Sequence, residues 1–147
     1  MNKSKTSLVL MELIISILFF SLASAVCVQL FVRAHLTTKE TKYLNEAVNI
    51  TQSISEVMNG TDGSLEQIKA CFPSAVGDDD YFVIYYDENF KETGNIENAS
   101  FVADVTVSSV SKLYNMDVTF AKFIDDTDDV EIIYSLSSSK YIRKSSK

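Results

Sequence analysis

The sequence predicts an α+β protein, in which a long N-terminal helix crosses a membrane and then packs on a small antiparallel β-sheet. Three observations predict this fold. Residues 7–32 are almost wholly apolar, the following segment is apolar on one face only, and the C-terminal half contains short alternating segments. A bilayer core about 30 Å thick takes roughly 20 helical residues. Leu13–Val32 supplies that length without a charge, so we expect one membrane-spanning helix there.

The helix is expected to continue beyond the apolar segment. From Thr37 to Asn59 the apolar side chains recur at steps of three and four residues, which is typical of an amphipathic helix. They are Leu44, Ala47, Val48, Thr51, Ile54 and Met58. No Pro or Gly separates the two segments, so we predict one helix from about Thr6 to Met58. Asn59 and Gly60 tolerate the left-handed backbone that ends many helices.

The C-terminal part of the sequence predicts a short helix followed by strands. Ser64 and Gln67 form a capping box that predicts a helix through about Cys71, before Pro73. Tyr81–Tyr86 is rich in aromatic and β-branched residues, which favours a strand. Three later segments alternate: Phe101, Ala103, Val105 and Val107; Met116, Val118 and Phe120; Val130, Ile132, Tyr134 and Leu136. They predict an antiparallel meander with one apolar face, which the amphipathic half of the helix can cover.

One acid, Glu12, stands just before the uncharged part of the apolar segment. A carboxylate at the centre of a membrane helix costs about 2.5–3.5 kcal/mol on insertion scales, and less near the boundary. Such an acid usually has a partner. The partner is either Lys3, Lys5 and water, or a positive group on another molecule.

These residues resemble the N-terminus of bacterial type IV pilins and pseudopilins. The shared features are a short basic leader, a small residue, four mostly apolar residues, an acid and an unbroken apolar helix. Leu10-Met11-Glu12-Leu13 follows the family's leucine–apolar–acid–leucine pattern. Ser7 stands where the family has the Gly after which a prepilin peptidase cuts. Leu8 stands where the family has the new N-terminal residue, often Phe, which is methylated. The resemblance covers roughly the first third of the chain.

The resemblance implies a structural subunit of a type IV pilus or of a type II secretion-like pseudopilus. Residues 1–7 would be the leader, 8–59 the long helix with about 8–34 in the membrane, and 60–147 an extracytoplasmic sheet domain. Glu12 would be the assembly residue, neutralised by the amine of Leu8 in the adjacent subunit. The partners would be other pilin or pseudopilin subunits, the membrane and a prepilin peptidase, and the sheet domain would lie outside the cell membrane or in a surface filament.

Composition and motifs predict neither an enzyme nor a nucleic-acid binder. The net charge is −7, and beyond residue 60 there are 16 acidic and 8 basic residues, an excess that repels phosphate backbones. His35 is the only histidine, and no Cys–His pair or Gly-rich phosphate loop is present. We expect no cofactor. The candidate Ca²⁺ ligands are Asp125, Asp126, Asp128 and Asp129, although a solvated hairpin turn is the favoured interpretation of this acidic loop, because it has no EF-hand spacing.

Two alternatives belong to other classes. The helix can be a plain anchor for a monomeric binding module, or it can be a signal peptide cut near Ala25, which would release a secreted domain. Ala23-Ser24-Ala25 fits a signal peptidase site. However, the apolar segment continues through Val32, and Glu12 interrupts its start. Both features favour retention of the helix.

Overall fold

The computed structural model describes residues 3–78, 81–110, 112–124 and 129–141. The chain divides into two compact units, residues 1–42 and residues 43–147. Helix α1 (Lys3–Gly60) contains most of the first unit and continues into the second. The prediction of one unbroken helix is therefore confirmed, and its ends lie within three residues of the expected ones. Residues 3–7 of the expected leader are already helical.

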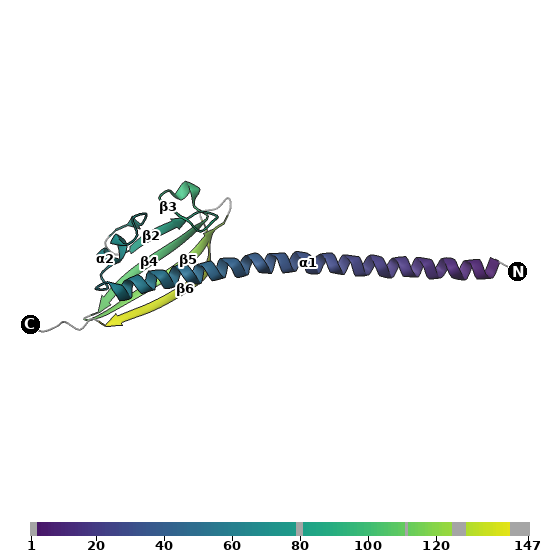
Figure 1. The fold of residues 1–147 in the computed structure, drawn as a ribbon, viewed down its shortest axis with the longest axis horizontal. Helices are drawn as coiled ribbons and strands as arrows, with labels where there is room; N and C mark the ends of the chain where they lie inside the picture. The colour runs from purple at the N-terminus through teal and green to yellow at the C-terminus, as the bar shows by residue number, and fades with distance from the viewer. Residues whose placement is uncertain (1–2, 79–80, 111, 125–128, 142–147) are drawn as a thin grey trace, which may run out of the picture. The chain divides into compact units, whose positions relative to one another are not determined.

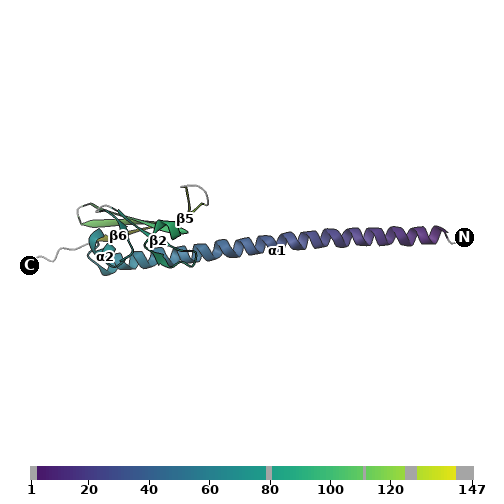
Figure 2. The same ribbon diagram turned by 90° about the horizontal axis from the view of Figure 1, so that it is seen from above.

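The second unit is an antiparallel sheet with helices on one of its faces. Figures 1 and 2 show the last turns of α1 and the short α2 (Leu65–Ala70) on the same side of the sheet. The strands run in the order β1-β2-β4-β5-β6, and β3 also pairs with β2. Their bounds are β1 Val76–Gly77, β2 Tyr81–Tyr86, β3 Glu92–Thr93, β4 Phe101–Val110, β5 Leu113–Phe123 and β6 Val130–Tyr141, with a short 3-10 helix at Ile96–Asn98. The α+β arrangement of a helix on a small antiparallel sheet is confirmed.

The core lies between α1 and the inner face of the sheet. Alternating residues of the strands are buried there, as the sequence pattern predicts. They are Phe82, Ile84, Phe101, Ala103, Val105, Met116, Val118 and Phe120. From α1 come Ala47, Thr51, Ile54 and Met58. The buried hydroxyl of Thr51 donates to the carbonyl of Val48 at 3.1 Å, so this polar group is satisfied inside the core.

The buried stripe of α1 is rotated slightly from the predicted one. Leu44 was expected in it but is 43% exposed. Tyr43 packs there instead, with its ring edge-on to Phe101 at 5.4 Å between centroids. Phe101 also stacks on Phe90 at 4.6 Å. These rings form an aromatic cluster at one end of the core. Tyr43 lies four residues before the buried Ala47, so it is in phase with the buried face of α1, although the predicted stripe begins at Leu44.

The last strand departs from the predicted alternation. Phe120 pairs with Tyr134, but its neighbour Ala121 pairs with Ile132, so β6 carries one extra residue, Ile133, as a β-bulge. Such a bulge reverses the in–out alternation. Ile133 therefore packs on the core, whereas Ile132 is 63% exposed on the outer face. The prediction that Ile132 faces the helix is wrong.

Local side chains and one glycine explain the start of α2 and the turns at both ends of β2. The predicted N-cap is confirmed, because the Ser64 side chain accepts from the amide of Gln67. The reciprocal bond of a capping box is replaced, because the Ser64 amide donates to Asp62 Oδ1 at 2.8 Å and not to the Gln67 side chain. Gly77 has φ +155°, and a Cβ there would lie 2.6 Å from the Cα of Phe82, so β1 can approach β2 only with glycine at this position. At the other end, Asp87 Oδ1 accepts from the amides of Asn89 and Lys91 at 2.8 and 2.9 Å, which forms a tight turn.

Candidate functional site: the apolar helix and its acid

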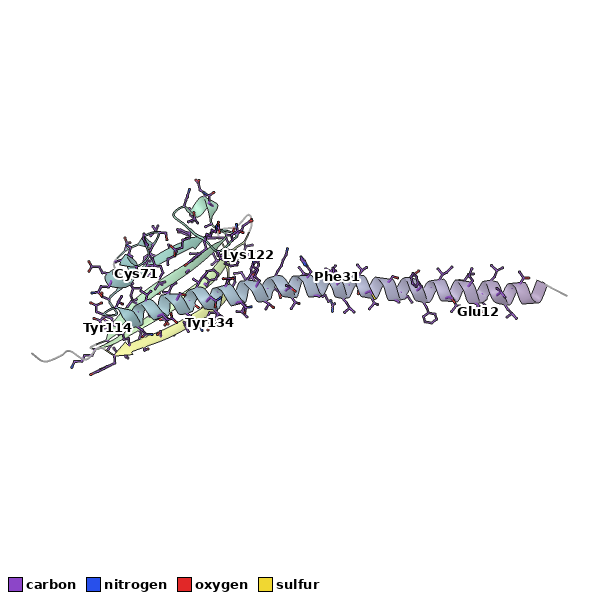
Figure 3. The ribbon with its side chains drawn as sticks, viewed as in Figure 1. Glu12, Phe31, Cys71, Tyr114, Lys122 and Tyr134 are labelled. Carbon is purple, nitrogen blue, oxygen red and sulfur yellow. The ribbon has the colours of Figure 1, made fainter. Side chains whose placement is uncertain are left out.

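The apolar part of α1 is long enough to cross a bilayer. Its most apolar 18-residue window has a mean hydropathy of 2.4 and is not buried inside the protein. Large side chains such as Phe20 and Phe31 are 75% and 80% exposed, and Figure 3 shows Phe31 projecting away from the helix. A surface of this kind needs an apolar environment, which lipid or neighbouring helices can provide.

Two hydroxyl groups within this segment bond inside the helix. Ser21 Oγ donates to the carbonyl of Ile17 and Ser24 Oγ to that of Phe20, each at 2.8 Å. Bonds to the carbonyl four residues earlier satisfy a serine without water. The two serines therefore do not oppose burial in hydrocarbon, where an unsatisfied polar group is costly.

Glu12 projects from the same segment. Its side chain is exposed, and Figure 3 shows it pointing away from α1. Its neighbours one turn away on the helix surface include Leu8 and Ile15, which are 65% and 46% exposed, and the small polar Ser16. Within the residues that the structure describes, no hydrogen bond or ion pair reaches its carboxylate. The acid predicted from the sequence is thus presented outward from an apolar surface.

Ser7 and Leu8, the predicted processing residues, lie in the first turns of α1 and are exposed. The bond between them is therefore helical. A peptidase that binds an extended chain would have to unwind this turn, which is the part of a helix that frays most easily.

The candidate calcium loop lies mostly outside the described residues. Asp125, Asp126 and Asp128 are not described, and Asp129 is exposed. The carbonyl of Asp129 accepts from the amide of Ile124 at 3.1 Å, which ties the ends of the β5–β6 connection together. In the described parts of the chain, no group of three or more His, Cys, Asp or Glu residues is placed to hold a metal ion.

Sequence reasoning missed a contact between the last strand and the end of α1. Lys140, half-buried on β6, donates to the carbonyls of Met58 at 3.1 Å and Asn59 at 2.8 Å, and also to that of Thr61. The last carbonyls of a helix lack partners within it and attract positive charge. The last turn of α1 contains no basic residue, so a lysine about 80 residues later supplies the cation.

The way in which α1 ends therefore differs from the predicted left-handed cap. Asn59 and Gly60 were expected to adopt the left-handed backbone, but Phe90 is the only non-glycine residue with positive φ among those described, and Gly60 has no positive φ either. The carbonyls are capped by Lys140 instead. A lysine in a Ser-rich strand gives no local signal of such a role.

Comparison with family models, with curated proteins and with solved structures finds no match.

Proposed function

We propose that this chain is a type IV pilin-like or pseudopilin-like subunit, held in the membrane by the first part of α1 before it assembles. One combination of features supports the proposal. An exposed acid stands near the start of an apolar helix, and the same helix continues without a break onto a small antiparallel sheet. A plain anchor has no need of an acid in its apolar surface, where a charge is costly.

In this proposal, assembly packs the apolar segments of neighbouring subunits together. A prepilin peptidase cuts after Ser7, and Leu8 then carries a free amine that is methylated. The amine of one subunit meets the Glu12 carboxylate of the next, so that two charges are neutralised in an environment of low dielectric constant. The sheet unit faces outward, in a pilus or in a secretion pseudopilus, and the chain itself performs no catalysis.

The test is Glu12→Ala in the full-length chain. Membrane insertion should be unchanged or improved, because a charge is removed from an apolar surface. Recovery of crosslinked subunits, or copurification of partner pilins, should fall sharply. Glu40→Ala is the matched control, because Glu40 is an exposed acid on the same helix beyond the apolar segment. Equal crosslinking in the wild type and the Glu12 variant would contradict the assembly role and favour a plain anchor.

A further inference from the structure

A groove of about 760 Å³ lies between α2 and the segment that leads into β1. Its floor is apolar and is held by the core, because Leu65 is buried and the Phe72 ring stacks on Phe82 at 6.2 Å between centroids. Ala75 completes this floor. Sites that bind small ligands have volumes of about 300–1,000 Å³, so the groove is large enough for several side chains of a bound segment.

The rim of the groove is negatively charged. Glu66 and Asp78 line it and are exposed. Lys69 also lines it, but its ammonium group donates to a backbone carbonyl of β1. Asp62 adds a carboxylate beside the first turn of α2, where it accepts from the side chain of Gln67 at 2.9 Å. An apolar floor with acids at its rim suits basic side chains, whose methylene groups cover the floor while their charged ends meet the acids.

The chain beyond Tyr141 has the matching chemistry. Residues 142–147 lie outside the described residues, and their sequence is Ile-Arg-Lys-Ser-Ser-Lys, with three cations and no acid. Six residues span up to about 20 Å when they are extended. We call residues 142–147 the basic tail. Its charge is opposite to that of the rim, and its two serines are small enough to follow a groove.

The contacts of Lys140 show that the basic tail starts near α2. Its ammonium group donates to the carbonyl of Thr61, just beyond α1. Hydrogen bonds with Ser64, and to a smaller extent the charge of Lys140, lower the pKa of the Asp62 carboxyl below its ordinary value of 3.8. The ammonium group therefore lies close to this carboxylate, which is itself bonded to the first turn of α2. Tyr141 is thus one loop away from the groove.

We propose that the basic tail folds back into this groove and holds α2 against the sheet. The first two cations of the tail meet the near rim at Glu66, and Lys147 meets the far rim at Asp78. The tail then joins β6 to α2, next to the place where Lys140 joins β6 to α1. The proposal goes beyond the assembly role and does not require it.

The basic tail of a second copy and a basic peptide of another protein are the competing occupants of the groove. The tail of the same chain is favoured because it starts beside the groove. A segment tethered by a short linker has an effective concentration on the order of millimolar, so it binds in preference to a free segment of equal charge.

The distance between two spin labels tests the proposal in the full-length chain in detergent. One label is attached to Cys71, which is exposed at the end of α2 (Figure 3), and the other to Ser146→Cys. Cys27→Ala removes the remaining cysteine. The distance distribution should be narrow, because the bound tail holds the second label in one place. Raised salt should broaden it, because salt screens exposed ion pairs.

Neutral variants of either partner should release the basic tail. Arg143→Gln/Lys144→Gln/Lys147→Gln removes the charge of the tail and leaves every described residue except the label sites unchanged. Glu66→Gln/Asp78→Asn removes the charge of the rim. Loss of two exposed ion pairs shifts such an equilibrium by about fivefold, so the narrow population should fall by at least about that factor in each variant.

The matched control removes two acids from another part of the sheet unit. Glu88 and Glu97 are exposed and follow β2 at the end away from β1. Glu88→Gln/Glu97→Gln changes the net charge by the same amount as the rim variant, and the narrow distribution should persist. A second control dilutes the labelled chain with unlabelled chain, which should leave the distribution unchanged when both labels belong to the same chain.

Four outcomes would overturn the proposal. A distribution in the wild type as broad as in the neutral-tail variant would leave the groove to another basic segment. A narrow distribution that persists in the rim variant would place the tail elsewhere, and an equal loss in the control variant would show a dependence on total charge only. A narrow distribution that disappears on dilution would assign the groove to the tail of a second copy. Because both labels lie in the sheet unit, a failure of the Glu12 assembly test would leave this result intact.

Discussion

Lys140 is the residue that ties the end of α1 to the edge of the sheet. Its ammonium group has three N–H donors, and three carbonyls accept from it. Tyr114, opposite it on β5, packs against the core beside it. The contact joins the last turn of the helix to the last strand, so one side chain holds together two elements that are distant in the sequence.

Replacing Lys140 by Met should therefore lower the free energy of unfolding by about 1–2 kcal/mol, because three helix carbonyls lose a charged donor. Amide hydrogen exchange in residues 57–61 should become faster. The full-length chain in detergent is suitable for both measurements. Lys112→Met, at an exposed lysine before β5, is the control. Equal exchange rates in the Lys140 variant and the wild type would mean that the contact does not stabilise the helix end.

Tyr86 makes the stability of the sheet unit sensitive to alkaline pH. It is 4% exposed, and burial, with a smaller effect from Glu92, raises the pKa of its phenol above the ordinary value of 10.0. The folded protein thus favours the neutral phenol, while the unfolded chain ionises near pH 10. The stabilisation is complete below about pH 10 and is lost as the pH rises above it.

Tyr86→Phe should consequently unfold with a weaker dependence on alkaline pH. Between about pH 10 and 12 the wild type should lose up to about 1.4 kcal/mol per pH unit more than the variant. The other tyrosines titrate in both proteins, so the difference isolates Tyr86. Denaturant unfolding at several pH values measures it, and parallel curves for the two proteins would contradict the expectation.

At the scale of elements, the β-bulge in β6 decides which of two adjacent isoleucines belongs to the core. Ile133 packs against the buried cluster, and Ile132 is exposed beside Ala121 on the outer face. Figure 3 shows Tyr134, the next residue, on this strand. The two isoleucines have the same side chain and almost the same place in the sequence, so they form a matched pair for testing the bulge.

We expect Ile133→Ala to cost about 1–2 kcal/mol of unfolding free energy, since a half-buried side chain loses packing. Ile132→Ala should change it by no more than about 0.5 kcal/mol, as is usual for surface positions. Thermal unfolding of the full-length chain in detergent compares them. A larger cost at Ile132 would place the bulge elsewhere and restore the simple alternation.

At the scale of the whole molecule, the N-terminus of the mature protein distinguishes three hypotheses for its function: a pilin-like subunit, a membrane-anchored binding module and a secreted domain. In the proposed function the chain begins at Leu8, because a prepilin peptidase removes the leader. A start at Val26 would indicate a secreted domain, and an intact Met1 would favour an uncleaved anchor. Intact mass of the protein isolated from its host measures this directly.

Ser7→Gly should speed removal of the leader by a prepilin peptidase, since glycine allows close approach of the peptidase to the bond. Intact mass again measures the removal. If the wild type and the variant have masses that both include the leader, this processing is excluded.

The sequence by itself determined the elements whose signals are local. The apolar segment, the amphipathic continuation of α1, the N-cap at Ser64 and the alternating parts of β4 and β5 all follow from spacing along the chain. The same holds for the candidate site, because Ser7, Leu8 and Glu12 were found by their order in the sequence. Their outward position on α1 follows from the helix alone.

Only the tertiary structure decided the features that depend on pairs of distant residues. The bulge at Ile133 depends on how β6 aligns with β5, and a local pattern cannot show that alignment. The Lys140 cap joins residues about 80 positions apart, and the ring contact between Tyr43 and Phe101 joins two residues that are also distant in the sequence. Spacing within a segment reports which face is apolar, whereas register and capping across the fold are set by partners that the segment does not contain.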